Sequence, residues 1–398
     1  MDSLARWSAV ALMLGVPTSI ALVNIGLFLL LVGWTFSGSF DRKFAVIRAN
    51  PITLPSLALF GLVLLGVLHT EAPDAVVRSH LYVYSKLPMM LVLLTLFDDV
   101  LWRRRAMAAF VIGSVITLVS TYANIWIEVP WSDSHERGFG VTHHVFNDYI
   151  AQGLAMSVFV AWCLAQNFAA RSRVVQVGFV ALTALAVFSI THLLAGRTGQ
   201  LVVLSMCGVM ALVKAPPHWR LPAVLVVMFG GCLLLLSSPL LRERVLQAWM
   251  DFNLYSSEGV VSTSIGARLD MWKNAWNMFL DSPLWGQGTG GYRVISSRIY
   301  ADASQCGVSC IHPHNQYLFF AVEHGLLGLT AYGLLLWALI RGAIRCQGGE
   351  RAMLAGFSTV LILDGFINGP FWVTTERHLF ASMLPLLMAS WPAGRRSA

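Results

Sequence analysis

The sequence predicts an all-α, polytopic integral membrane protein with about 12 transmembrane helices. Of its 398 residues, 57% are hydrophobic and only 12% are charged, which is about half the charged share of an ordinary soluble domain. Uncharged runs of about 20 residues, the length that crosses a hydrocarbon core, recur from one end of the chain to the other. We therefore expect residues 1–398 to form a single polytopic membrane domain.

The predicted helices follow one another along the whole chain. Residues 7–40 form an apolar run long enough for two helices, joined near Pro17. Runs that reach spanning length by themselves are 49–70, 106–127, 149–170, 174–196 and 221–241. Shorter apolar runs that reach it with flanking polar residues are 87–97, 198–213, 325–340, 352–363 and 379–391.

The basic residues predict the orientation, because loops rich in Lys and Arg stay in the cytoplasm. Alternate assignment of the loops places 16 of the 27 basic residues on one side, with only five acidic residues. These basic residues are Arg6, Arg42, Lys43, Arg48, Arg103, Arg104, Arg105, Arg171, Arg173, Lys214, Arg220, Arg341, Arg345, Arg351, Arg395 and Arg396. Both termini are therefore expected in the cytoplasm. The net charge of +7 is explained as a topology signal, and no nucleic-acid partner is expected because no basic stretch is interleaved with aromatics on a soluble domain.

The first apolar run is expected to remain as an anchor, since it continues into a second helix without a small-residue cleavage site. Four cysteines fall in or beside predicted helices, where they pack as small apolar side chains. They are Cys163, Cys207, Cys232 and Cys346. Cys306 and Cys310 lie on a predicted outer segment, where a disulfide is left open. No second Cys or His pair stands at zinc spacing, so no metal is expected.

One large outer segment, 238–312, is predicted between transmembrane helices 9 and 10, and a medium one at 128–148. The large segment holds amphipathic helical patterns at 242–251 and 267–281. Its glycine-rich stretch 286–291 follows no strand, so it predicts a turn rather than a phosphate-binding loop.

Three basic residues lie in or beside predicted helices near the lipid, where a charged side chain is energetically costly and therefore suggests a function. Arg197 and Arg268 each open a predicted helix, so guanidinium, backbone N–H groups and helix dipole together suit an anion such as pyrophosphate. Lys86 lies near the outer end of the fourth predicted helix. The alternative is that each side chain merely reaches the lipid headgroups.

Several short motifs, in this order, resemble the O-antigen ligase superfamily, the lipid A core:surface polymer ligases, which also contains Wzy-type O-antigen polymerases. They are Gly-Arg-Thr-Gly at 196–199, Arg-Leu-Asp-Met-Trp at 268–272, Pro-His-Asn-Gln-Tyr-Leu at 313–318 and Glu-His-Gly-Leu-Leu-Gly at 323–328. Upstream, Arg-Gly-Phe at 137–139 leads to Asn147, preceded here by Phe146 where the family usually has proline. The resemblance covers about 137–327.

The resemblance implies a metal-independent, inverting glycosyltransferase of GT-C-like architecture that needs no cofactor. Such an enzyme takes a polysaccharide from undecaprenyl pyrophosphate and transfers it to a sugar hydroxyl of lipid A core, on the periplasmic face of the bacterial inner membrane. By motif, His314 corresponds to the family's essential histidine, and Arg197 and Arg268 to its essential arginines. The residue types fit, since neutral imidazole accepts a proton near pH 7 and guanidinium groups stabilise a departing pyrophosphate.

Substrate-binding candidates are Lys86, Arg137, Asn315, Tyr317 and Asp364. As a carboxylate inside or at the end of a helix, Asp364 is expected to pair with a basic residue. It would orient His314 or an arginine, or satisfy a neighbouring helix.

Further polar residues have lesser roles. Glu323 and Arg377 are weaker candidates for such pairing, and His312 and His324 are expected to be supporting or structural. The pair His143 and His144 is not expected to bind metal, because adjacent side chains on a helix diverge. The alternative for His314 itself is a helix cap or another satisfied hydrogen-bonding residue.

Two other functions stay open. A Wzy-type polymerase shares the donor chemistry, although polymerases often carry two sizeable outer loops where this chain has one. A lipid-linked glycan transporter or flippase is disfavoured because no internal repeat is visible. The particular polysaccharide, the acceptor sugar and the oligomeric state are not encoded in recognisable motifs.

Overall fold

The computed structural model describes residues 1–300, 306–307 and 309–390. Within these residues all regular structure is helical, which confirms the predicted all-α class. The N-terminal half contains α1 (Asp2–Gly15), α2 (Ile20–Thr35), α3 (Phe40–Ala49), α4 (Thr53–Gly66), α5 (Asp74–Tyr84), α6 (Lys86–Leu96), α7 (Val100–Ala123), α8 (Tyr149–Ala169), α9 (Arg173–Phe188) and the π-helix η1 (Ser189–Leu193). The C-terminal half contains α10 (Arg197–Lys214), the 3₁₀-helix η2 (Pro217–Trp219), α11 (Arg220–Ser237), α12 (Pro239–Glu258), α13 (Ser264–Asp281), α14 (Gly291–Ile299), α16 (Gln316–Arg345), α17 (Gly348–Ile367) and α18 (Thr374–Met388).

Six stretches in the described part of the chain are long and apolar enough to cross a membrane. They comprise α7, α8, α9 with η1, α10, η2 with α11, and α16. A seventh results if α2 and α3, bent by 119° at a short break, count as one span. The protein thus has the helices of a polytopic membrane protein, and the count of about 12 stays a prediction. The two helices expected at 7–40 are confirmed, with the break at Val16–Ser19 around Pro17.

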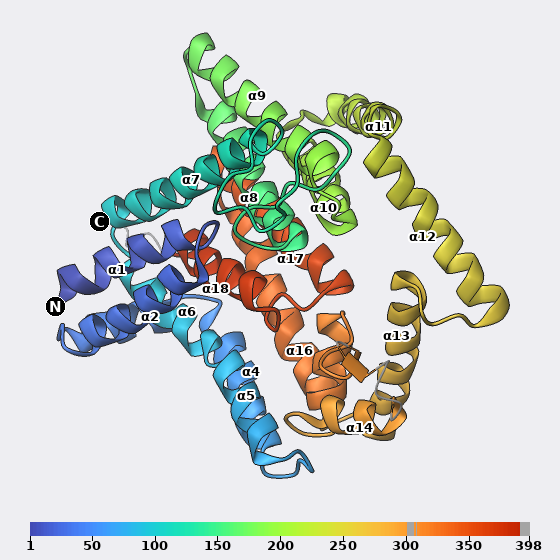
Figure 1. The fold of residues 1–398 in the computed structure, drawn as a ribbon. Helices are drawn as coiled ribbons and strands as arrows, with labels where there is room; N and C mark the ends of the chain where they lie inside the picture. Colours follow the sequence, from blue (N-terminus) through green and yellow to red (C-terminus); the bar gives the residue numbers. More distant parts are fainter. Residues whose placement is uncertain (301–305, 308, 391–398) are drawn as a thin grey trace.

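The helices divide into central and peripheral ones. In α8, 72% of the apolar window is buried inside the protein, whereas none of that window is buried in the η2 and α11 stretch. An apolar helix with no protein cover is expected to face lipid. Helices α8, α10, α16 and α17 pack on one another in the centre, while α12 extends away from the bundle and α13 returns to pack against α16 (Figure 1).

The long helix α16 is broken at Gly325, whose backbone has φ 61° and ψ −153°. A turn from the outer segment satisfies the backbone groups that the break exposes. Gln287 and Gly288 donate their N–H groups to the carbonyls of Val322 and Glu323, at 2.7 and 3.0 Å. The glycine-rich stretch is therefore a turn, as predicted, and it anchors the outer segment to α16.

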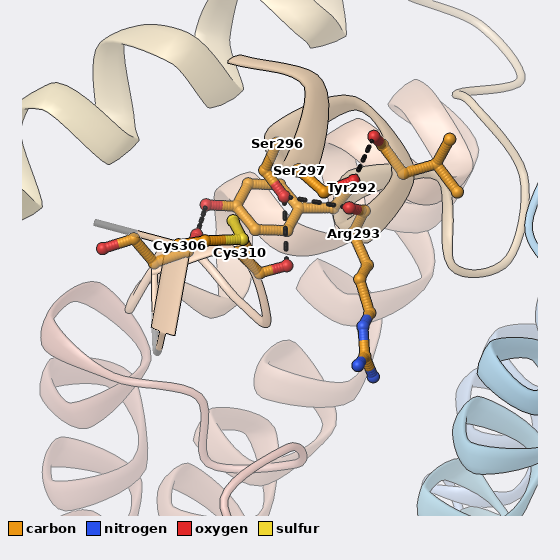
Figure 2. The surroundings of a disulfide bond; sticks show 8 residues. Tyr292, Arg293, Ser296, Ser297, Cys306 and Cys310 are labelled. Carbon is orange, nitrogen blue, oxygen red and sulfur yellow. Dashed lines mark hydrogen bonds between the residues drawn. A yellow bond between two sulfur atoms is a disulfide. The ribbon is translucent and has the colours of Figure 1, made fainter. Parts of the chain in front are cut away.

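The segment that leads from α14 to the start of α16 is held by a disulfide between Cys306 and Cys310 (Figure 2). From α14, the Tyr292 hydroxyl donates to the Ser309 carbonyl at 2.8 Å, and the Ser296 hydroxyl to the Cys310 carbonyl at 3.0 Å. The predicted amphipathic patterns at 242–251 and 267–281 lie in α12 and α13. Residues 301–305 and 308 of the predicted segment 238–312 lie outside the described residues, and its boundaries stay a prediction.

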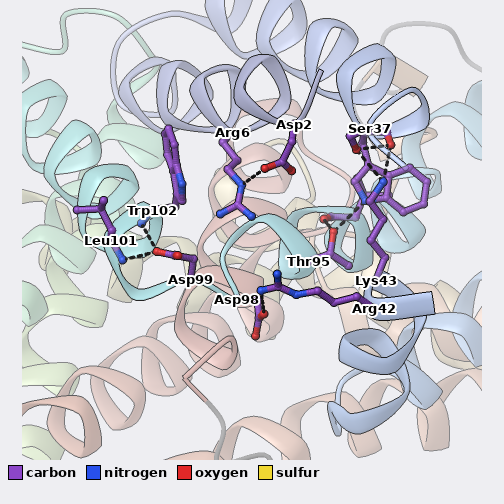
Figure 3. Close-up of polar contacts among 12 residues, drawn as sticks. Asp2, Arg6, Ser37, Arg42, Lys43, Thr95, Asp98, Asp99, Leu101 and Trp102 are labelled. Atoms are coloured by element: carbon purple, nitrogen blue, oxygen red, sulfur yellow. Dashed lines mark hydrogen bonds and ion pairs between the residues drawn. The ribbon is translucent and has the colours of Figure 1, made fainter. Parts of the chain in front are cut away.

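One end of the bundle gathers residues that the sequence assigns to the cytoplasmic side. Arg42 forms an ion pair with Asp98 at 3.0 Å, Arg6 pairs with Asp2 at 2.7 Å, and Lys43 lies beside them (Figure 3). Helix α18 ends at this end of the bundle, where the Arg103 guanidinium donates to the Ala389 carbonyl. Fifteen residues of helix span about 22 Å, so the start of α18 lies at the opposite end.

The break in α16 generates a stability prediction. A Cβ on residue 325 would meet the Leu284 carbonyl oxygen, and the positive φ strains any L side chain. Gly325→Ala should therefore lower the free energy of unfolding by about 2 kcal/mol, measured by thermal unfolding in detergent. Gly333→Ala on the same helix is the control, because nothing lies within 4 Å of its added methyl group. Equal unfolding temperatures for the two variants would contradict the break.

Candidate active site

His314 is held in an uncommon backbone conformation just before α16. Its φ is 48°, a left-handed value found at only three non-glycine residues of the described chain. Such a conformation costs of order 1–3 kcal/mol and persists where surrounding contacts impose it, often at functional sites. Here the His314 N–H donates to Nδ1 of His312 at 3.1 Å, and Asn315 caps α16 by accepting the Leu318 N–H at 3.0 Å. His312 therefore has the supporting role predicted for it.

The His314 imidazole is oriented by Asn368, which follows α17. His314 Nδ1 lies 3.1 Å from Oδ1 of Asn368, and Nδ2 of Asn368 donates to Oε1 of Glu376 on α18. Because Glu376 takes the amide N–H, the amide oxygen faces His314 and can only accept a hydrogen bond. Nδ1 therefore carries the proton, and Nε2 presents a free lone pair.

Glu376 lies near a second carboxyl group. The charge of Asp364, near the end of α17, acts on Glu376, and both side chains are essentially inaccessible to solvent. Two such carboxylates repel each other strongly when both are ionised, which favours protonation of at least one of them. Asp364 forms no ion pair with a basic residue in the described part of the chain, so the expected pairing is corrected, and Glu376 is the ionisable group that acts on it most strongly.

Arg268 faces His314 from α13. The pKa of His314 is lowered to about 4, mainly by burial and then by the charge of Arg268, while the hydrogen bond with Asn368 acts in the opposite direction. Burial also brings the pKa of His312 well below its usual value, with smaller contributions from His314 and Arg268. The His314 imidazole is therefore neutral at physiological pH, and its free Nε2 can accept a proton.

Arg197, the first residue of α10, lies close enough to Arg268 for its charge to act on it. Burial lowers the pKa of Arg268, and the charge of Arg197 is the next largest cause. Nη1 of Arg197 is buried with no hydrogen-bond partner, and neither arginine forms an ion pair within the described residues. Two close guanidinium groups that form no ion pair are suited to bind an anion, although the carboxyl group of Asp251 acts on Arg197 and that of Glu376 acts on Arg268. The structure thus brings together His314, Arg268 and Arg197 from three separate elements.

The structure also shows where the other predicted substrate-binding residues lie. Asn315 and Tyr317 are engaged in the protein: the Asn315 amide donates to the Phe366 carbonyl, and the Tyr317 hydroxyl to the Ile362 carbonyl. Arg137 is exposed on the loop before α8 and pairs with Glu128 at 2.9 Å. Lys86 is buried at the start of α6, apart from the arginine pair. Substrate contacts by these residues stay predictions.

The histidine pair before α8 is not on a helix, which corrects the premise of the sequence argument. His143 Nε2 lies 2.7 Å from the Gly138 carbonyl, while His144 lies 3.2 Å from Asp133. The two rings therefore serve different local contacts. In the described part of the chain, no group of three or more His, Cys, Asp or Glu side chains is arranged to hold a metal ion.

Sequence reasoning missed Asn368 and Glu376. Both lie in the short polar stretch between two apolar runs, close to Asp364 and next to Arg377, which were noticed. An acidic residue at the edge of an apolar run is itself a signal, so Glu376 was recognisable as a candidate. The proximity of Glu376 to Asp364 could not be recognised from the sequence, because the chain leaves the helix between the two residues.

Comparison with known proteins shows that part of the chain is similar to a known family. Residues 182–333 match the family model described as O-antigen ligase, a region that contains Arg197, Arg268 and His314 and covers less than half of the chain. The resemblance to the O-antigen ligase superfamily is thereby confirmed.

Two individual proteins are also similar. An uncharacterized protein of Haemophilus influenzae is 33% identical over 113 residues, 27% of this chain and 28% of that protein, so the chain covers only about a quarter of that relative's length. A solved structure entitled "Structural coordination of polymerization and crosslinking by a peptidoglycan synthase complex" has a TM-score of 0.48 and 18% identity, over 85% of this chain and 95% of that chain.

The geometry predicts how His314 titrates. Diethyl pyrocarbonate modifies neutral imidazole, so His314 should stay reactive down to about pH 5 and lose reactivity as the pH falls through its pKa of about 4. Arg268→Gln removes a charge that lowers this pKa, so it should shift the transition upward by about 1 pH unit. Modification is measured by peptide mass spectrometry. The exposed Arg298→Gln is the control, and an identical shift in both variants would contradict the contact between Arg268 and His314.

Proposed function

We propose that the protein is an O-antigen ligase, which transfers O-polysaccharide from undecaprenyl pyrophosphate to a sugar hydroxyl of lipid A core. The reaction takes place on the periplasmic face of the bacterial inner membrane, with both chain termini in the cytoplasm. One observation carries the proposal: a neutral imidazole with a free Nε2 lies near two buried guanidinium groups that form no ion pair within the described residues. This is a proton acceptor beside a pyrophosphate site, within a region that matches the O-antigen ligase family.

The proposed reaction is a single displacement with inversion. Nε2 of His314 accepts the proton of the acceptor hydroxyl as its oxygen bonds to the anomeric carbon of the donor. The bond from that carbon to the pyrophosphate breaks, and its electron pair leaves with undecaprenyl pyrophosphate. Arg197 and Arg268 stabilise the charge that develops on this leaving group. The chemistry requires no metal and no cofactor.

Donor binding also activates the base. The positive charge of Arg268 lowers the pKa of His314, so a pyrophosphate bound at Arg268 offsets that charge and raises the pKa toward neutrality. The imidazole then becomes a stronger base only when the leaving group is in place. Asn368, held by Glu376 and Asp364, keeps Nε2 directed at the reacting hydroxyl throughout.

The remaining candidates take supporting roles in this proposal. Asp364 positions the base through Glu376 and Asn368. Asn315 and Tyr317 shape the entry to α16 beside the substrates, and Arg137 contributes positive charge at the rim. The polymerase shares the donor chemistry, and the single dominant outer segment at 238–312 favours the ligase.

Loss of the base tests the proposal in cells. His314→Ala should reduce transfer at least about 100-fold, since a positioned general base typically contributes that much or more. Electrophoresis of lipopolysaccharide should show loss of the capped ladder and accumulation of free core, with unchanged membrane insertion. The control is His135→Ala, which replaces another histidine of positive φ on an exposed loop.

Two results would overturn the assignment. A normal ladder from His314→Ala would remove the histidine from the chemistry. A deletion strain that still caps its core with single repeats would show that attachment to lipid A core does not need this protein, and would identify it as the polymerase.

A further inference from the structure

A second group of cationic side chains lies apart from the arginine pair, at the same end of the bundle. Lys86 begins α6, and Arg377 and His378 lie in the first turn of α18, which packs against α6. They are 8%, 3% and 4% exposed. Lys86 and Arg377 lie close enough for their charges to act on one another, and both charges act on His378. We refer to these three residues as the Lys86 cluster.

The cluster is short of partners. Lys86 Nζ lies 4.3 Å from the centre of the Tyr82 ring, and one guanidinium nitrogen of Arg377 donates to the Trp372 carbonyl at 2.6 Å. Nε of Arg377 and both ring nitrogens of His378 are buried with no hydrogen-bond partner. Over residues 1–300, 306–307 and 309–390, no carboxylate forms an ion pair with any of the three side chains.

Such an arrangement is energetically unfavourable when no ligand is bound. Two buried cations that repel each other, removed from water and without an ion-pair partner, carry a desolvation penalty that the Tyr82 ring and the Trp372 carbonyl offset only in part. Arg377 is too deeply buried to extend to the headgroups, so simple anchoring at the membrane surface does not explain it. An anion that binds between Lys86 and Arg377 removes both the repulsion and the unsatisfied donors.

The cluster is separate from the proposed donor site yet close to the base. Arg197 and Arg268 come from α10 and α13, and neither is among the charges that act on the Lys86 cluster. Arg377 directly follows Glu376, whose side chain holds Asn368 against His314. Since the donor has one pyrophosphate, which the arginine pair binds, a second anion site next to the base is available to the other substrate.

We propose that the Lys86 cluster binds a phosphate group of the acceptor and thereby places the acceptor hydroxyl beside His314. This inference rests on the proposed ligase function and adds a chemical requirement to it. A phosphate monoester carries about −1.5 to −2 charges and three acceptor oxygens, which matches the two cationic side chains of Lys86 and Arg377 and the open donors of Arg377 and His378. A carboxylate has half that charge.

The first test separates the two substrates kinetically. In enzyme reconstituted in nanodiscs, Lys86→Met should raise KM for lipid A core at least tenfold and leave KM for the donor unchanged. With core that has been dephosphorylated by aqueous hydrogen fluoride, wild type and Lys86→Met should have the same KM. Arg298→Met, an exposed arginine paired with Glu71, is the control and should match wild type with both acceptors.

The second test does not depend on activity. Inorganic phosphate should raise the thermal unfolding temperature of an Arg197→Gln variant but not that of the Arg197→Gln, Lys86→Met double variant. Without phosphate, Lys86→Met should unfold at the same temperature as wild type or higher, because a buried unpaired charge has been removed.

Three outcomes for Lys86→Met would overturn the inference. They are an unchanged KM for phosphorylated core, a raised KM for the donor in place of the core, or a lowered unfolding temperature together with a lower kcat. The anion site and the ligase function can fail separately. If phosphate raises the unfolding temperature only when Lys86 is present, but the protein transfers no glycan, the anion site is supported and the ligase function is rejected.

Discussion

The contact on which the rest of the site depends is the hydrogen bond between His314 Nδ1 and Asn368. It fixes which imidazole nitrogen carries the proton, and Glu376 fixes it in turn by accepting the amide N–H of Asn368. The Glu376 carboxyl group is buried near that of Asp364, an arrangement that favours protonation of at least one of the two. Four residues from α17, α18 and the entry to α16 thus convert an ordinary histidine into a proton acceptor of defined direction.

The fold supplies the surroundings of this contact. The starts of α6, α10, α16 and α18 and the end of α17 lie at one end of the bundle, so backbone donors and basic side chains collect there. The break of α16 at Gly325 and the glycine-rich turn that fills it tie the outer segment to the bundle, and α13 carries Arg268 back over His314. The proposed donor, base and acceptor sites are therefore built on separate helices, and their relative placement depends on helix packing.

Much of this was predictable from local sequence. Apolar runs located the helices, Pro17 marked a break, and the glycines at 286–291 indicated a turn, because each signal acts over a few residues. The motifs around Arg197, Arg268 and His314 indicated the residues on which the proposed mechanism depends. Their neighbours could not be identified in the same way: Asn368 contacts His314 across a loop and is held by Glu376, and the charge of Arg377 acts on Lys86 from the far end of the chain. Local pattern also misassigned His143 and His144, which lie in a loop whose form is imposed by contacts with Leu193 and Gly138.

The measurement that tests the account most directly is a structure of the protein in nanodiscs with a donor that carries undecaprenyl pyrophosphate. The account predicts pyrophosphate oxygens in hydrogen-bond contact with both Arg197 and Arg268, and Nε2 of His314 open toward the face of the anomeric carbon opposite the leaving group. A pyrophosphate bound away from these arginines, or a His314 ring turned so that Nε2 contacts Asn368, would contradict it.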